Sequence, residues 1–306
     1  MKTQTGRVAR QTRGSGRDAA ASGGVPHLCE VRLKSVYDAL KRAERRAADY
    51  VRSHPARIRS WSIVQVARGA GCSEATLVRL ARRLGYKGYA ALKSDFRAAT
   101  GPPDPLLEYG DITAQDGFLA VAEKVFAASI QSLTDTLSVL DGPRYEAAVE
   151  ALVGARRIVF CGLGDAAVVA LSAAQKFSRL DTDCRASADP DLQLIYCSHL
   201  SAGDVVVAVS HSGRSRPVLD SAREAARRGA LVIGITNVPY SPLAKAAQIV
   251  LLTADFSEHI TGEVISKRVS ELCILESLYV NYLLHKGQRS RRALAQSNRA
   301  VGVNKI

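Results

Sequence analysis

The stretch Asp204-Val-Val-Val-Ala-Val-Ser-His-Ser-Gly-Arg-Ser215 decides the fold of the longer part of this 306-residue chain. Its apolar run predicts a buried strand at Val205–Val209, and Arg216-Pro217 predicts a helix start, because proline in a first turn loses no helical hydrogen bond. We expect the loop between them to bind an anion with backbone amides and hydroxyls at the helix N-terminus. The nominated loop residues are Ser210, Ser212, Gly213, Arg214 and Ser215. The alternative is an ordinary strand–helix turn with a serine cap.

Four more apolar segments predict strands around this one. They are Ile158–Cys161, a weaker one at Asp183–Ala186, Leu231–Ile235 and Ile249–Leu252. Continuous β-branched runs that alternate with helices predict a parallel sheet covered on both faces. A long amphipathic helix is expected over 118–140, and another over 263–285.

Residues 1–30 show no periodicity, and from Ser35 to residue 98 the apolar residues follow helical spacing. Helices are expected from Ser35 to His54-Pro55, from Ile63 to Gly71, from Ser73 to Gly85 and over 89–98. Ser73 suits the N-cap of the third, and Glu74 suits its dipole. When the apolar stripe of this third helix faces inward, polar and basic side chains remain on its outer face. Such a face is typical of a recognition helix that binds in the major groove of DNA. The nominated DNA-binding residues are Ser73, Glu74, Thr76, Arg79, Arg82, Arg83 and Lys87. A helical hairpin with a solvated basic face is the alternative.

Charge separates the two parts of the chain. Residues 1–100 carry 21 Lys and Arg against 7 Asp and Glu, a net charge of +14, whereas 101–285 carry 15 against 22. A basic domain beside an acidic one favours a polyanion as the partner of the first. We therefore expect double-stranded DNA as that partner.

Two resemblances cover 34–285 together. The segment SIVQVARGAGCSEATLVRLARRLGYKGYAALK is similar to the N-terminal domain of RpiR-family sugar-responsive regulators. SHSGRS, with GLG at 162–164 and GITN and SPLA within 234–244, resembles the SIS (sugar isomerase) domain that follows this head in that family. The resemblance implies an all-α helix-turn-helix head and a flavodoxin-like α/β SIS domain with a five-stranded parallel sheet. It also implies a phosphorylated sugar or sugar-acid effector, and a homo-oligomer, dimer or tetramer, that forms through this domain and binds a palindromic operator.

The glycine turn departs from the family pattern G-x-G-x-S, because Ala166 stands at the serine position after Gly164 and Asp165. A carboxylate there opposes phosphate but suits sugar hydroxyls. Since the start of the last SIS helix commonly reaches a ligand site, further effector contacts are nominated there: Glu258, His259, Glu263 and Arg268.

Domain limits follow from composition: a disordered basic arm at 1–30, the helix-turn-helix domain at 31–99, a proline-rich linker at 100–116, the SIS domain at 117–287 and a flexible basic tail at 288–306. No apolar run is long enough for a membrane span or a signal peptide, and the six scattered cysteines favour a reducing cytoplasm. We expect no metal, no cofactor and no catalysis. The rival is a sugar-phosphate isomerase or lyase, with Glu263 or His259 as general base.

Overall fold

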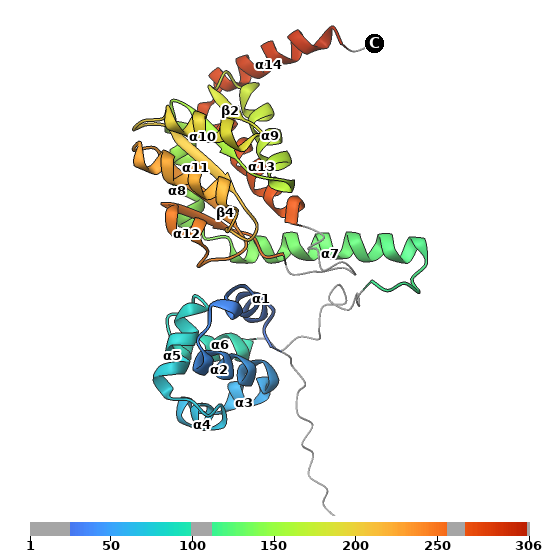
Figure 1. The fold of residues 1–306 in the computed structure, drawn as a ribbon. Coiled ribbons are helices and arrows are strands. Elements are labelled where there is room, and N and C mark those ends of the chain that lie inside the picture. The colour runs from blue at the N-terminus through green and yellow to red at the C-terminus, as the bar shows by residue number, and fades with distance from the viewer. Residues whose placement is uncertain (1–24, 99–111, 256–266, 305–306) are drawn as a thin grey trace, which may run out of the picture.

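The computed structural model describes residues 25–98, 112–255 and 267–304. They form a helical unit, a long helix and an α/β unit (Figure 1). Within these ranges no helix combines the length and the apolar character that crossing a membrane requires. The linker predicted at 100–116 lies mostly outside them.

The helical unit comprises residues 27–98. Its helices are α1 (His27–Val36), a 3₁₀ turn (Tyr37–Ala39), α2 (Arg42–Ser53), α3 (Pro55–Ser60), α4 (Ile63–Gly69), α5 (Glu74–Arg83) and α6 (Tyr89–Ala98). Their apolar faces share one core that contains Leu33, Val51, Leu77, Leu80 and Phe96. This all-α architecture is the predicted one.

Two local predictions in this unit are wrong. The disordered arm was expected to reach residue 30, but α1 begins at His27, because Cys29 and Leu33 are buried in the core. The single helix expected from Ser35 to His54 is interrupted at Leu40, where the backbone is extended. The backbone N–H of Lys41 instead donates to the Glu44 carboxylate (3.0 Å), which starts α2 with a capping box.

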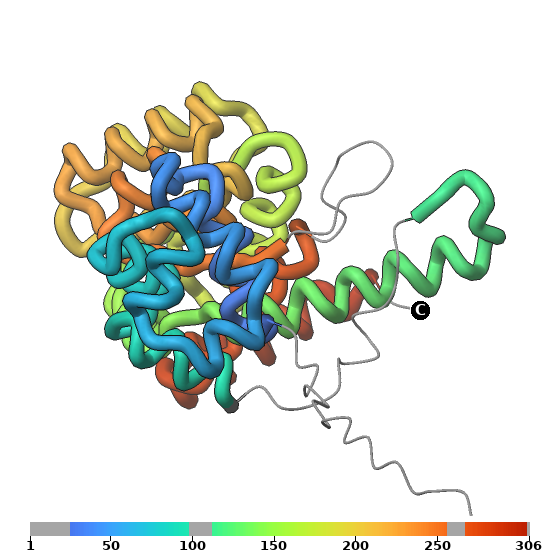
Figure 2. Tube along the Cα trace, turned by 90° about the horizontal axis from the view of Figure 1, so that it is seen from below, coloured from blue at the N-terminus to red at the C-terminus, as the bar shows by residue number. Residues whose placement is uncertain are grey.

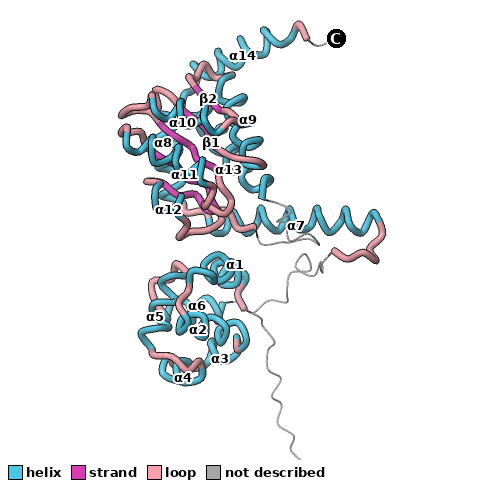
Figure 3. Tube along the Cα trace, in the orientation of Figure 1, coloured by secondary structure: helices cyan, strands magenta, loops and turns pink. Residues whose placement is uncertain are grey.

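The α/β unit follows α7 (Phe118–Val139). Its elements are α8 (Gly142–Gly154), β1 (Ile158–Cys161), α9 (Asp165–Ser178), β2 (Cys184–Ala186), α10 (Pro190–Ser198), β3 (Val205–Val209), α11 (Arg216–Arg227), β4 (Leu231–Thr236), α12 (Pro242–Ala246), β5 (Ile249–Leu252), α13 (Lys267–Lys286) and α14 (Gln288–Gly302). The five strands of the described residues pair in parallel, as predicted, and the structure adds their order, β2-β1-β3-β4-β5. The sheet lies inside a shell of helices (Figure 3).

Two apolar clusters cover the two faces of the sheet. One contains Phe160 and Val207 of the sheet with side chains of α8, α9 and α13. The other contains Val206 and Val232 with side chains of α10, α11 and α12. The strands are buried on both faces, which explains their continuous apolar sequence.

The strand order reverses direction between β1 and β3. The connection from β1 leads outward to β2, and the connection from β3 leads the other way to β4. Ligands of open α/β sheets bind at such a switch point, outside the carboxyl ends of the strands. The GLG turn follows β1 and the SHSGRS loop follows β3, so both loops meet at this position.

The predicted flexible tail is wrong for Gln288–Gly302, which form α14. Ser290 of this helix is buried, and the Ser297 hydroxyl donates to the Arg179 carbonyl (2.9 Å). In Figure 1 the helix lies at the end of the α/β unit that faces away from the helical unit. Seen from below, α7 extends past both units as an arm (Figure 2).

Candidate effector pocket and DNA-binding surface

A pocket of about 270 Å³ lies at the switch point of the sheet. Its lining comes from three elements that are far apart in the sequence: the turn after β1, the loop after β3 and the start of α13. The lining residues are Leu163, Asp165, Ala166, Val209, Ser210, His211, Ser212, Ser215, Lys267 and Glu271. The predicted serine loop and glycine turn therefore share one site.

Gly213 gives the serine loop its shape. Its φ is +62°, a left-handed conformation that L side chains rarely adopt. A Cβ there would lie 2.1 Å from Ser241 Oγ and 2.9 Å from Thr236 Oγ1. The loop is therefore packed against the turn that follows β4, and only glycine fits at this point.

Two helices point their N-termini at the pocket. α11 begins after Ser215, and α9 begins after Gly164, whose φ is +60°. Free backbone amides and the helix dipole favour an anion at such ends. The pocket therefore favours negative charge even before any side chain is considered.

The Ser215 hydroxyl is not used as a helix cap. Ser215 occupies the N-cap position of α11, yet its side chain accepts no backbone hydrogen bond. Its Oγ is buried and has no hydrogen-bond partner in the part of the chain that the structure describes. Ser212 Oγ accepts a hydrogen bond from the backbone N–H of Arg214 (3.3 Å). The alternative of a serine-capped turn therefore does not account for Ser215, because a buried hydroxyl without a partner is unfavourable.

Asp165 is neutralised by cations that the loop prediction did not include. Its carboxylate lies 2.9 Å from Lys267 Nζ and 3.7 Å from an Arg268 guanidinium nitrogen. The hydrogen bond from Lys267 lowers the pKa of Asp165. Repulsion of a phosphate by this carboxylate is therefore reduced, and Arg268 acts through Asp165 without lining the pocket.

Sequence reasoning missed three lining residues with chemistry: His211, Lys267 and Glu271. Burial, with a smaller effect of Lys267, lowers the pKa of His211 to about 4. Burial and the nearby Asp255 raise the pKa of Glu271 to about 8. The available signal was the i, i+4 spacing of Lys267 and Glu271 at the start of an otherwise apolar helix stripe.

The remaining nominated effector residues have separate outcomes. Arg214 is exposed and does not line the pocket. Glu258, His259 and Glu263 lie outside the described residues.

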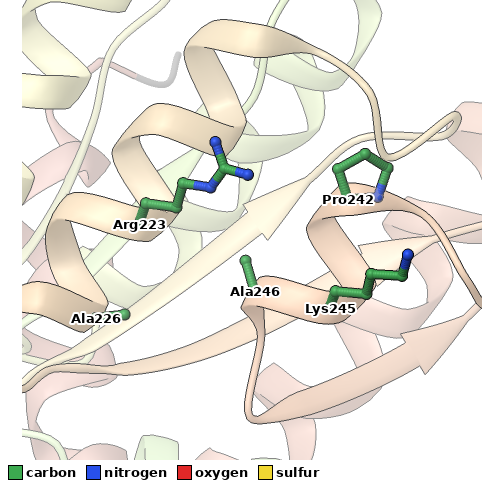
Figure 4. A pocket seen from close by; sticks show the side chains of 5 residues that line it. All are labelled: Arg223, Ala226, Pro242, Lys245 and Ala246. Carbon is green, nitrogen blue, oxygen red and sulfur yellow. The ribbon is translucent and has the colours of Figure 1, made fainter.

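A second depression lies between α11 and α12 (Figure 4). Its lining consists of Arg223, Ala226, Pro242, Lys245 and Ala246. No loop that follows a strand lines it, and the one helix that begins there, α12, has only five residues. The switch-point pocket is therefore the better candidate for an effector site.

In the helical unit, α4, the turn at Gly71 and α5 form the helix-turn-helix. Gly71 has a φ of +59°. Ser73 caps α5, because its Oγ accepts a hydrogen bond from the backbone N–H of Thr76 (3.3 Å). Several nominated residues are exposed on this helix and just after it: Ser73, Glu74, Arg79, Arg82 and Lys87.

Thr76 is buried, so its predicted outward position is wrong. It precedes Leu80 by one helical turn and thus lies on the packed face. Its hydroxyl accepts a hydrogen bond from Arg79 (3.0 Å) and interacts with the Ser73 hydroxyl (2.9 Å). Thr76 therefore orients its neighbours instead of facing outward.

Arg83 is half-buried and joins the two units. Its guanidinium lies 3.4 Å from the buried Glu44 carboxylate and 5.5 Å from the ring centre of Tyr240. The Tyr240 hydroxyl donates to the Arg83 carbonyl (3.5 Å). The end of α5 thus contacts the turn between β4 and α12. A second contact joins α1 to α7, where His27 pairs with Asp135.

Together these features define a protein with a helix-turn-helix unit and a parallel α/β unit that has an anion-suited pocket at its switch point. Residues 28–100 match the model of the helix-turn-helix domain, rpiR family, and residues 151–280 match the model of the SIS domain. This chain belongs to the RpiR family of helix-turn-helix transcriptional regulators.

Curated relatives support this assignment over most of the chain. An uncharacterized HTH-type transcriptional regulator of Caldanaerobacter subterraneus is 30% identical over 86% of this chain and 93% of its own length. The HTH-type transcriptional regulator HexR of Pseudomonas aeruginosa is 32% identical over 83% of this chain and 89% of its own.

Among solved structures, the NanR protein of Vibrio vulnificus complexed with ManNAc-6P is similar, with a TM-score of 0.56 and 26% identity over 90% of this chain and 98% of NanR. The sugar isomerase domain of an RpiR transcription factor from Sphaerobacter thermophilus has the same fold, with a TM-score of 0.54 and 23% identity over 58% of this chain and 98% of that domain.

Proposed function

We propose that this chain is a cytoplasmic transcriptional regulator whose binding to a palindromic operator is controlled by a phosphorylated sugar in the switch-point pocket. One observation carries the effector part: the Ser215 hydroxyl at the helix N-terminus that faces the pocket is buried and has no hydrogen-bond partner among the described residues. A phosphate oxygen supplies the acceptor that this hydroxyl lacks. Arg268 and Lys267 balance the Asp165 carboxylate and leave the site suited to an anion.

The size of the pocket supports a small effector. Its volume of about 270 Å³ is near the lower end of the roughly 300–1,000 Å³ that ligand sites occupy. One phosphorylated monosaccharide suits that volume. ManNAc-6P, which is bound in the similar NanR structure, is a ligand of this class.

The exposed side of α5 supports sequence-specific DNA binding. Arg79 and Arg82 are available to base edges or phosphates, and arginine binds guanine edges with two hydrogen bonds. We propose that a homo-oligomer, at least a dimer, places two heads on operator half-sites related by two-fold symmetry.

Contacts between the units support effector control. The serine loop is hydrogen-bonded to the turn after β4, since the Asn237 N–H donates to the His211 carbonyl (2.9 Å) and the Leu243 N–H donates to the Gly213 carbonyl (3.0 Å). The same turn carries Tyr240, whose ring lies beside Arg83 at the end of α5. A shift of the loop on effector binding therefore has a short route to the recognition helix.

Thermal unfolding with candidate effectors tests the pocket. Inorganic phosphate, N-acetylmannosamine 6-phosphate, glucose 6-phosphate and 6-phosphogluconate are compared with unphosphorylated N-acetylmannosamine. A ligand at a hundred times its dissociation constant adds about 2.7 kcal/mol to the free energy of unfolding. The proposal is supported if phosphorylated compounds stabilise the protein and N-acetylmannosamine does not. It is contradicted if none of the phosphorylated compounds changes the stability.

Operator selection from random DNA, followed by fluorescence anisotropy with and without the stabilising compound, tests control of DNA binding. An affinity that the compound leaves unchanged contradicts it.

An isomerase or lyase is the rival, because His211 and the protonatable Glu271 are groups that acid–base chemistry uses. We propose that the pocket binds without turnover, in line with relatives that are named as regulators. Nuclear magnetic resonance of each sugar phosphate incubated with the protein tests this point, and conversion to an isomer or cleavage product supports the enzyme.

A further inference from the structure

Glu271 is a lining residue of the pocket that phosphate binding at the serine loop does not use. It lies one turn after Lys267 on α13 and is only 1% exposed. Its Oε1 is buried and has no hydrogen-bond partner within the described parts of the chain. A carboxyl oxygen held in this way, on the wall of a pocket, is unfavourable unless another group completes its hydrogen bonding.

Among the residues that the structure describes, charged and titratable groups reach Glu271 from several elements. They are Lys267 on its own helix, Asp165 at the start of α9, which also pairs with Arg268, His211 in the serine loop, and Asp255 after β5, which lies near Asp135 of α7. Burial and then Asp255 raise the pKa of Glu271 to about 8, and Lys267 opposes them. The Glu271 carboxyl therefore keeps its proton at neutral pH, and the His211 ring is uncharged.

We infer that Glu271 is a specificity-determining residue that binds a hydroxyl group on the sugar part of the phosphorylated effector. This inference rests on the proposed function. A protonated carboxyl offers one donor and one acceptor, and a sugar hydroxyl offers the same pair, so both groups are satisfied together. A phosphate at the serine loop and a hydroxyl at Glu271 orient the sugar across the pocket.

The same groups select the effector class. Asp165 stays ionised on the pocket wall, and Glu271 becomes a second carboxylate when it loses its proton. A carboxylate on the ligand would meet these oxygens, whereas hydroxyl groups hydrogen-bond to them. Because Lys267 and Arg268 offset Asp165, this selection rests on Glu271, which favours an uncharged sugar body beside it over a sugar acid most strongly when it is ionised.

Calorimetric titration of the full chain tests this role. Wild type, Glu271→Gln and Glu271→Ala are titrated at pH 7 and pH 9 with N-acetylmannosamine 6-phosphate, glucose 6-phosphate, 6-phosphogluconate and inorganic phosphate. Glutamine keeps a donor and an acceptor without a titratable proton. N-acetylmannosamine 6-phosphate and glucose 6-phosphate are the two ligands whose sugar part is uncharged. For whichever of them wild type binds more tightly, we expect Glu271→Ala to lower the affinity about three- to tenfold at pH 7 and Glu271→Gln to keep the wild-type affinity. Inorganic phosphate should bind all three proteins equally.

The pH profile separates this role from a structural one. Between pH 7 and pH 9 the affinity of wild type for the sugar phosphate should fall relative to Glu271→Gln, because only wild type gains a charge. Equal affinity of wild type and Glu271→Ala overturns the inference, as does a loss in Glu271→Gln as large as that in Glu271→Ala. The inference is also wrong if wild type binds inorganic phosphate but binds neither N-acetylmannosamine 6-phosphate nor glucose 6-phosphate more tightly than inorganic phosphate. Failure of inorganic phosphate and all sugar phosphates to bind wild type contradicts the proposed function instead. Thermal melts and circular dichroism confirm that each variant is folded.

Discussion

Replacement of Ser215 by alanine tests the effector site most directly, because two explanations of this serine predict opposite results. If Ser215 were a helix cap, the substitution would reduce the free energy of unfolding by about 0.5–2 kcal/mol. The structure contains no such cap bond, and Ser215 Oγ is buried without a partner among the described residues. We therefore expect Ser215→Ala to leave the stability of the effector-free protein unchanged or raise it by up to about 1–3 kcal/mol.

Effector affinity should respond in the other direction. A hydrogen bond to a charged group contributes about 1.5–3 kcal/mol. Ser215→Ala should therefore lower the affinity for N-acetylmannosamine 6-phosphate and for inorganic phosphate roughly ten- to hundredfold. Calorimetry measures this loss, and denaturant unfolding without ligand measures stability. Lower stability of Ser215→Ala with unchanged affinity for both compounds would refute the reasoning.

Two serines provide matched controls. Ser62 does cap its helix, since its side chain accepts a hydrogen bond from the backbone N–H of Gln65. Ser62→Ala should therefore lower stability and leave phosphate binding intact. Ser221 lies on the same helix as Ser215 and is fully buried, but it does not line the pocket. Ser221→Ala should leave phosphate affinity unchanged.

Four further predictions follow from the described contacts. Arg79→Ala and Arg82→Ala should each weaken operator binding by about 1–3 kcal/mol in anisotropy titrations without changing effector affinity, and wild-type DNA affinity in both variants would contradict the recognition surface. The raised pKa of Glu271 makes the folded state hold a proton that the unfolded chain releases near pH 4.5, so the contribution of Glu271 to stability should be full below pH 4.5 and should be lost as the pH rises to about 8. Glu271→Gln should flatten this decline in melts across pH 5–9, and an identical profile in both proteins would exclude Glu271 as its source. Light scattering at micromolar concentration should give at least a dimer, and a monomer with and without DNA would be incompatible with a palindromic operator. Tyr240→Ala should preserve effector binding yet reduce the effect of the effector on operator affinity, whereas full coupling in this variant would place the route elsewhere.

The sheet could be predicted well because its strands are buried on both faces. Continuous apolar runs at Ile158–Cys161 and Val205–Val209 leave few other structures, and the structure has strands at these residues. The loop after β3 was identifiable because strand, hydroxyl-rich loop and helix start are contiguous. Contiguous residues carry local signals, so no knowledge of the tertiary fold was needed.

The missed features depend on residues that only the fold brings together. Thr76 is an exception, because Leu80 follows it by one helical turn and spacing alone places it on the packed face, where its hydroxyl interacts with Ser73. Glu271 has an unusual environment because Asp255 and Asp165 reach it from other elements. α14 was missed because its packed side combines the serines Ser290 and Ser297 with a single large apolar residue, Leu294, which is too weak a stripe to separate it from a solvated tail.

In the proposed control of DNA binding, the close approach at Gly213 begins a chain of contacts from the pocket to the head. A Cβ at Gly213 would lie 2.1 Å from Ser241 Oγ, so the serine loop packs directly against the turn after β4. That turn carries Tyr240, which contacts Arg83 by one ring–cation contact and one hydrogen bond. Such contacts contribute about 0.5–1 and 0.5–1.5 kcal/mol. Their sum lies within the 1–3 kcal/mol of typical allosteric coupling, which corresponds to roughly 5- to 150-fold in affinity. Displacement of this single contact pair is therefore large enough for an effector in the pocket to change the affinity of the head for its operator.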